Sequence, residues 1–191
     1  IQKSFVIITE FVDYCAPFDN RYSEFKKPDF YKIYNSIYLK RWFAVNFDYS
    51  LTEKLNDNLE KISFLPLGLN FHTIKNMKMW MENKTSYKEQ EESLLNIYKN
   101  SQENSNRINK CFYCCNNNTS ATLKKAGYIN EDRKEIKSKV LNNPLVDVSD
   151  NIRRTEMWKK FAKYNFIIAP AGNGMDTHRL WEGLFLGCIV I

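Results

Sequence analysis

The sequence predicts an α/β fold with a mainly parallel sheet, and two observations lead to this prediction. Short uninterrupted apolar runs, such as Phe5–Thr9 and Phe166–Ala169, are typical of strands buried on both faces of a parallel sheet. Between these runs lie segments whose apolar residues recur every three to four positions, which indicates helices. Strands that alternate with helices favour a parallel sheet with helical crossovers.

The first part of the chain is predicted to contain three strands and one helix. Phe5–Thr9 is the first strand, expected to be fully buried. Residues 28–40 are predicted to form a helix, because isoleucines and tyrosines recur there four positions apart. Buried strands are expected at Trp42–Val45 and at Lys61–Leu65, and a Pro-Leu-Gly turn closes the last of them.

The second part is predicted to continue the alternation. A helix is expected over 86–99, opened by the capping box Ser86-Tyr-Lys-Glu89. A strand at 110–115, a charged helix at 131–141 and a helix at 153–164 follow. A change of composition near residues 66–85 divides the chain into an N-terminal half, 1–66, and a C-terminal half, 67–191.

Composition and charge narrow the function classes. Of the 191 residues, 43% are hydrophobic and 15% aromatic, enough for a real core and too many for a disordered tail. The net charge of +6 suits a polyanion or a phosphate-bearing ligand, but no basic arm or nucleic-acid motif is present, so we expect no nucleic-acid partner. The largest basic cluster is interrupted by acidic residues and is interpreted as a solvated helix face. Its members are Lys124, Lys125, Arg133, Lys134, Lys137 and Lys139.

The cysteines are interpreted as buried thiols rather than metal ligands. Cys111-Phe-Tyr-Cys114-Cys115 would need a second half-site of Cys or His, and the only histidines, His72 and His178, are isolated. We therefore expect no metal. No apolar run is long enough to span a bilayer, which leaves membrane association open and the compartment undecided between cytoplasmic and Golgi-type lumenal.

Residues 166–191 carry the strongest chemical signal. Pro170 ends a buried strand, and Gly172-Asn173-Gly174 is expected to supply positive φ angles and to let backbone N–H groups approach a ligand. A helix follows, and Asp176 or Thr177 is expected to cap its first turn. Its buried face is predicted from a repeat of Leu180, Leu184 and Gly187, with Gly187 also closing the helix.

A strand, a glycine-rich loop and a helix N-terminus form an anion site in many open α/β sheets. Arg179 lies in the first turn, where a cation opposes the helix dipole unless an anion is near, and it can pair with a diphosphate. Glu182 shares its face and can accept hydrogen bonds from ribose hydroxyls. The alternative is an ordinary intrahelical ion-pair set of Asp176, Arg179 and Glu182. His178 is interpreted as a structural imidazole in preference to a general base.

The pattern Pro170-x-Gly172-x-Gly174-x-Asp176-x-x-Arg179-x-Trp181-Glu182-x-Leu184-x-x-Gly187-Cys-Ile resembles the C-terminal motif of exostosin-like glycosyltransferases, most closely the small exostosin-related proteins. Residues 42–46 and 65–72 are similar to that group more loosely. The resemblance implies a GT-B type fold of two Rossmann-like halves. It implies transfer of a sugar from a nucleoside-diphosphate sugar to a hydroxyl of a glycan or glycoprotein acceptor, with no cofactor besides the donor.

The resemblance also implies roles for individual residues. Gly172, Asn173 and Gly174 would line the donor loop, Arg179 would hold the diphosphate, and Glu182 the ribose or sugar. Asp176 and His178, in the same segment, are also counted among the substrate-binding residues. A catalytic base would come from the other half, where Asp13 and His72 are the candidates. Gly174 stands where many retaining GT-B enzymes have an acidic residue, so the stereochemical outcome is left open.

Two further interpretations stay open at this stage. One is a degenerate module that binds a nucleotide sugar or glycan without turnover. The other is nucleic-acid binding through the basic surface, which dispersed charge disfavours. Because Cys188–Ile191 has the pattern of a strand in mid-run, we also expect the C-terminal half to be truncated.

Overall fold

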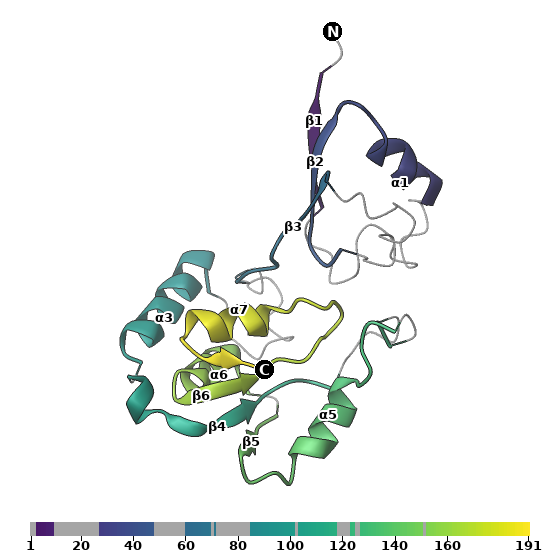
Figure 1. The fold of residues 1–191 in the computed structure, drawn as a ribbon. Helices are drawn as coiled ribbons and strands as arrows, with labels where there is room; N and C mark the ends of the chain where they lie inside the picture. The colour runs from purple at the N-terminus through teal and green to yellow at the C-terminus, as the bar shows by residue number, and fades with distance from the viewer. Residues whose placement is uncertain are drawn as a thin grey trace. The chain divides into compact units, whose positions relative to one another are not determined.

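The computed structural model describes residues 3–9, 27–47, 60–69, 71, 85–101, 103–117, 123–124, 127–150 and 152–191. The chain forms two compact units (Figure 1). Unit 1 comprises Ile1–Leu67 together with the short segment Asn173–Asp176. Unit 2 comprises Gly68–Gly172 and Thr177–Ile191. The chain therefore leaves unit 2 after Gly172, passes through four residues that pack with unit 1, and returns at Thr177.

Unit 1 contains a three-stranded parallel sheet in the order β1-β2-β3. The strands are β1 (Phe5–Thr9), β2 (Leu39–Ala44) and β3 (Ile62–Phe64), and the helix is α1 (Lys27–Tyr34). Phe30 of α1 is fully buried, and its ring lies 5.2 Å from that of Trp42 in the central strand. This aromatic contact, with Tyr34 stacked on Phe30, forms the core between helix and sheet.

Two sequence predictions for this unit are wrong in detail. The helix predicted over 28–40 ends at Tyr34, because the chain turns at Ser36, whose Oγ accepts from the Tyr38 amide, and re-enters the sheet at Leu39. Ile37, counted as part of the helical repeat, is 77% exposed. The first strand forms as predicted but is not fully buried: Ile8 is 61% exposed, whereas Ile7, which points to the opposite face of the sheet, packs against the core.

Unit 2 contains a four-stranded, wholly parallel sheet in the order β5-β4-β6-β7. Its strands are β4 (Ile108–Tyr113), β5 (Val146–Val148), β6 (Tyr164–Ile168) and β7 (Ile189–Val190). Its helices are α3 (Tyr87–Lys99), the short 3-10 helix η4 (Asn104–Asn106), α5 (Arg133–Val140), α6 (Arg154–Phe161) and α7 (His178–Phe185). The molecule is thus mixed α/β with mainly parallel sheets, as predicted, and is compatible with a Rossmann-like fold.

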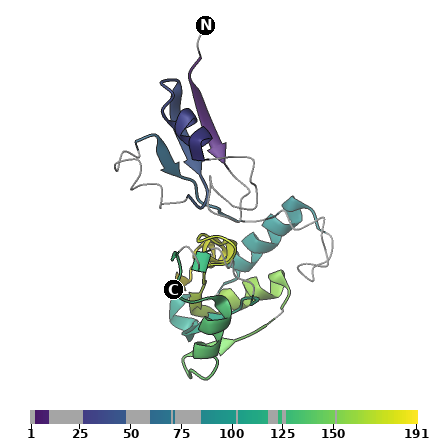
Figure 2. The ribbon, with the colours of Figure 1, turned by 90° about the vertical axis from the view of Figure 1, so that its right-hand side faces the viewer.

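One face of this sheet carries the main core. Leu94 of α3, Trp158 and Phe161 of α6 and Leu186 after α7 form one core cluster with Phe112 of β4 and Ile167 of β6. Figure 2 shows the helices and strands of this unit from a second side. The β4–α5–β5 crossover runs along the sheet in the opposite direction, so a right-handed connection puts α5 on the other face. The three predicted helices are present with shorter ends. The capping box is confirmed, because Ser86 and Glu89 exchange both side-chain to backbone hydrogen bonds.

The orientation of α7 differs from the prediction. Leu184 is 49% exposed, and the buried residues of this helix are Glu182 and Gly183. The cause is close packing on β6: a Cβ on Gly183 would lie 2.1 Å from Cδ1 of Ile167, so only glycine permits this approach. Gly187 does follow the helix end as predicted, with φ of 80°.

Candidate site at the carboxyl edge of the unit 2 sheet

The order of strands in unit 2 reverses beside β4. The chain passes from β4 to β5 on one side and then to β6 on the other side. In open α/β sheets, ligands bind outside the carboxyl ends of the strands at such a switch point. Two loops leave the sheet there: Cys114–Asn116 after β4 and Ala169–Gly172 after β6.

Arg179 extends from the first turn of α7 to the loop after β4. Its Nε donates a 2.8 Å hydrogen bond to the carbonyl of Cys114. The side chain is half-buried, and among the residues that the structure describes its two terminal nitrogens have no hydrogen-bond acceptor. The guanidinium is therefore oriented by one bond and keeps a pair of donors for an anion.

The N-terminus of α7 is not capped as predicted. Thr177 occupies the N-cap position, but its side chain makes no capping bond, and its buried Oγ1 has no partner among the described residues. Its carbonyl accepts from the Leu180 amide at 3.1 Å. The Asp176 carboxylate, the other candidate, accepts from the Leu67 amide instead. A helix terminus with an unsatisfied buried hydroxyl is suited to a ligand oxygen.

Glu182 lies deeper than the sequence indicated. It is 2% exposed, and its Oε1 accepts from Nε and Nη2 of Arg154 at 2.9 and 2.6 Å. The Arg154 guanidinium also stacks on Trp158, 4.8 Å from the ring centroid. No hydrogen bond to Oε2 is present within the described part of the chain. Arg154, at the start of α6, is therefore a functional candidate that sequence reasoning missed, since nothing in the sequence connects it with Glu182.

Arg133 was also missed, because the sequence placed it in the solvated basic cluster. Its side chain is buried and donates to both loops of the site: Nε to the Ala171 carbonyl, Nη2 to the Pro170 carbonyl and Nη1 to Asn116 Oδ1, at 3.0, 3.3 and 2.8 Å. The other described lysines of the cluster do behave as predicted. Lys124, Lys137 and Lys139 form exposed or half-exposed ion pairs.

The glycines of the predicted donor loop need a correction. Among the described glycines, positive φ angles occur at Gly68, Gly127 and Gly187, and neither Gly172 nor Gly174 is one of them. Gly172 is required for a different reason: a Cβ there would lie 2.5 Å from Nη2 of Arg133. The loop thus makes room for a guanidinium rather than adopting an unusual backbone conformation.

The structure does not bring all the predicted site residues together. Gly172, Arg179 and Glu182 belong to unit 2, whereas Asn173, Gly174 and Asp176 pack in unit 1. There the Asp176 amide donates to Asn46 Oδ1 at 2.7 Å. His178 uses its ring, since Nδ1 lies 2.8 Å from the Gly68 carbonyl and must donate to it. The base candidates Asp13 and His72 lie outside the described residues.

The cysteines around β4 are free thiols. Cys114 and Cys115 are buried and Cys111 is half-buried. Burial raises the pKa of the Cys114 thiol to about 11, although the nearby Arg179 acts in the opposite direction. Within the described ranges no three His, Cys, Asp or Glu side chains are grouped to hold a metal ion. The donors at the carboxyl edge are instead guanidinium, backbone and hydroxyl groups.

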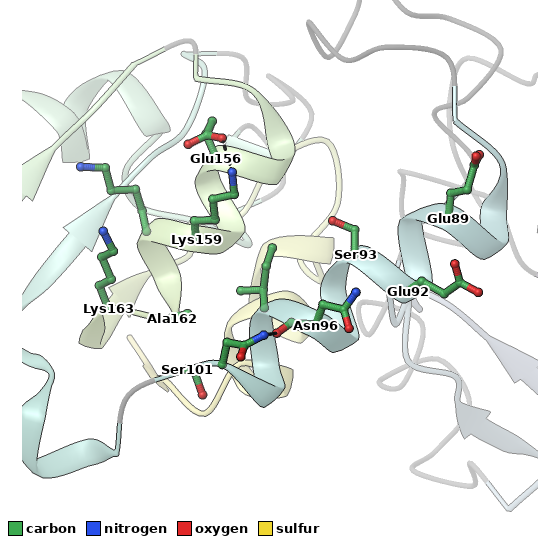
Figure 3. Close-up of a pocket in the computed structure, with 12 residues that line it drawn as sticks. Glu89, Glu92, Ser93, Asn96, Ser101, Glu156, Lys159, Ala162 and Lys163 are labelled. Carbon is green, nitrogen blue, oxygen red and sulfur yellow. Dashed lines mark hydrogen bonds and ion pairs between the residues drawn. The ribbon is translucent and has the colours of Figure 1, made fainter.

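A groove of about 680 Å³ lies elsewhere in unit 2, between α3 and α6 (Figure 3). Glu89 and Glu92 line one part, and Lys159, Lys160 and Lys163 another, over a floor at Ala162. Lys163 directly precedes β6, so this part of the groove is near the amino edge of the sheet. None of the predicted site residues lines it. Among its charged residues, Lys159 pairs with Glu156, and Glu92 pairs with Lys88 outside the groove.

No protein-family model matches the chain, and a comparison with curated proteins finds no significant match. In the part of the chain that the structure describes, no helix has both the length and the apolar character needed to cross a membrane.

Proposed function

We propose that unit 2 binds the diphosphate of a nucleoside-diphosphate sugar at the carboxyl edge of its sheet, and that the protein is a glycosyltransferase of GT-B type. The observation that carries this proposal is Arg179. Its Nε is anchored on the Cys114 carbonyl, and its terminal nitrogens keep their donors beside the N-terminus of α7. A cation at that position opposes the helix dipole and is stabilised when an anion lies between the two.

Two neighbouring groups support the same ligand. The buried Oγ1 of Thr177, without a partner among the described residues, would donate a hydrogen bond to a phosphate oxygen. Glu182 is held by Arg154 through Oε1, which leaves Oε2 to accept from ribose hydroxyls. The parallel sheet with its switch point at β4 is the arrangement in which nucleotides bind in many doubly wound proteins.

The chemistry expected of such a site is leaving-group stabilisation. When the bond between the sugar C1 and the diphosphate oxygen breaks, negative charge develops on the departing diphosphate. Arg179 and the α7 terminus would stabilise that charge. The oxygen of the acceptor hydroxyl forms the new bond to C1 and gives up its proton to a base, for which Asp13 and His72 are the candidates from sequence.

The test is a thermal-shift titration of the protein with a panel of nucleoside diphosphates and their sugars, followed by calorimetric determination of Kd. We expect the melting temperature to rise with at least one diphosphate, by linkage to a native-state ligand. Arg179→Ala should weaken binding about tenfold or more, since a charge-assisted pair is lost. Lys163→Ala removes one positive charge at the opposite edge and should leave Kd within about twofold. Absence of binding by the folded wild type would refute the proposal.

A further inference from the structure

We propose that Arg133 is a positioning residue of the anion site, which sets the relative position of the loops after β4 and β6. The proposal rests on the proposed function of unit 2 as a diphosphate-binding unit. Arg133 is the first residue of α5, and its three guanidinium nitrogens each donate to a different acceptor. Two of these acceptors, the carbonyls of Pro170 and Ala171, are in one loop, and Oδ1 of Asn116 is in the other.

Hydrogen bonds on both sides hold the backbone of Arg133 in place. The capping box of Asp132 and Glu135 holds the first turn of α5, and the Tyr113 hydroxyl at the end of β4 donates to the Arg133 carbonyl at 2.9 Å. The guanidinium is planar and presents its donors in fixed directions, so it transmits this position to both loops. A lysine ammonium in its place has three donors around one atom and cannot span the same acceptors.

The loops so fixed are the ones that build the anion site. Asn116 lies two residues beyond Cys114, whose carbonyl orients Arg179. Gly172 lies five residues before Thr177 at the start of α7, and its missing Cβ is what allows Nη2 to sit against the backbone at that point. Loss of the three hydrogen bonds from the Arg133 guanidinium should therefore misplace Arg179 relative to the N-terminus of α7.

The sheet provides a matched control at its other edge. Arg107, just before β4, is also buried and donates to backbone carbonyls, those of Leu186 at 2.9 Å and Tyr164 at 3.5 Å. It too lies against a glycine, since a Cβ on Gly187 would be 3.3 Å from its Nη2. Arg107 and Arg133 thus resemble each other in burial and bonding, but Arg107 is at the amino edge.

The experiment compares Arg133→Lys with Arg107→Lys in the full chain. Melting temperature, Kd for the nucleoside diphosphate selected by the panel, and hydrogen exchange of segments 114–116 and 169–174 are measured for both. We expect both variants to have a lower melting temperature than the wild type. Only Arg133→Lys should weaken binding, by about tenfold as for other residues that orient ligand-contacting groups, and only it should speed exchange in the two segments. Should Arg133→Lys fail to fold, the substitution Asn116→Ala takes its place. Asn116 is exposed, and its loss removes one of the three acceptors of the Arg133 guanidinium, so Asn116→Ala should weaken binding severalfold.

The possible results separate the two proposals. If the wild type binds a diphosphate and Arg133→Lys binds it equally well, the positioning role is wrong and the proposed function stands. Equal loss of binding in both lysine variants would show that Arg133 acts through general stability alone. If the folded wild type binds no diphosphate, the proposed function fails, and the positioning role falls with it whatever the exchange data show.

Discussion

The buried side chains of Arg133 and Arg107 each restrict the size of the residue that packs against them. Each guanidinium occupies space next to a backbone, and the residue at that point is glycine, Gly172 or Gly187. The sequence led us to explain both glycines by backbone conformation, and this holds for Gly187 but not for Gly172. The burial of Arg133 had one available signal: like Arg179, it stands in the first turn of a helix, where a cation is disfavoured unless acceptors compensate.

The burial of Cys188 predicts a dependence of stability on pH. Burial raises the pKa of the Cys188 thiol to about 11, above the value of about 8.5 for an exposed thiol. A raised folded-state pKa leaves stability intact below the unfolded pKa and lowers it as the pH rises toward the folded pKa. The free energy of unfolding should thus fall between pH 8 and pH 10.5. Urea titrations at both values should show a smaller fall for Cys188→Ala, and equal falls would contradict the assignment.

At the scale of elements, the sequence predicted which segments are helices and strands better than where they end or which face they bury. Runs such as Phe166–Ala169 and the capping box at Ser86 depend on local interactions and are found as predicted. The face of α7 depends on a contact between Gly183 and Ile167, fifteen or more residues away along the chain, which no periodicity reveals. The pairing of Glu182 with Arg154 is hidden for the same reason.

The packing of α7 on β6 can be tested with Gly183→Ala. The new Cβ would meet Cδ1 of Ile167 at 2.1 Å, so the Ile167 side chain, or the helix and strand that carry the contact, must shift. We expect a loss of about 1–3 kcal/mol in the free energy of unfolding, as for other overpacked cores. Leu184 is the next residue, and its side chain is 49% exposed. The control Leu184→Ala should therefore change the free energy of unfolding by roughly 0.5 kcal/mol or less. Denaturant titration of both variants measures these free energies of unfolding. If Gly183→Ala leaves the free energy of unfolding unchanged, the contact between Gly183 and Ile167 is looser than described.

The ion pair between α6 and α7 gives a second test at this scale. Arg154→Ala leaves the buried Glu182 carboxylate without its cation, which typically costs about 3–5 kcal/mol. Adding Glu182→Gln removes the stranded charge and should recover part of the loss. Lys159→Ala breaks an exposed pair with Glu156 and should cost about 1 kcal/mol or less. If the double variant is less stable than Arg154→Ala, the carboxylate is not the source of the cost.

At the scale of the whole molecule, the chain has two separate cores. Phe30, Tyr34 and Trp42 form the core of unit 1. In unit 2 the core lies between β4 and β6 and the helices α3 and α6. Each core is built on its own parallel sheet. Unit 2 carries the residues proposed to bind the donor.

Separate cores predict separate unfolding transitions, because compact units with their own cores tend to unfold as independent cooperative units. Phe30→Leu, at a fully buried position of unit 1, should lower one transition in a calorimetric scan, and Gly183→Ala should lower the other. A loss of 1 kcal/mol corresponds to a fall in Tm of roughly 2–8 °C for units of this size, so the shifts are resolvable. A nucleoside diphosphate should raise only the transition that Gly183→Ala lowers, because a ligand stabilises the unit that binds it. A single transition that moves with both substitutions would show that the two cores unfold together, and a ligand shift of the Phe30→Leu transition would place the donor in unit 1.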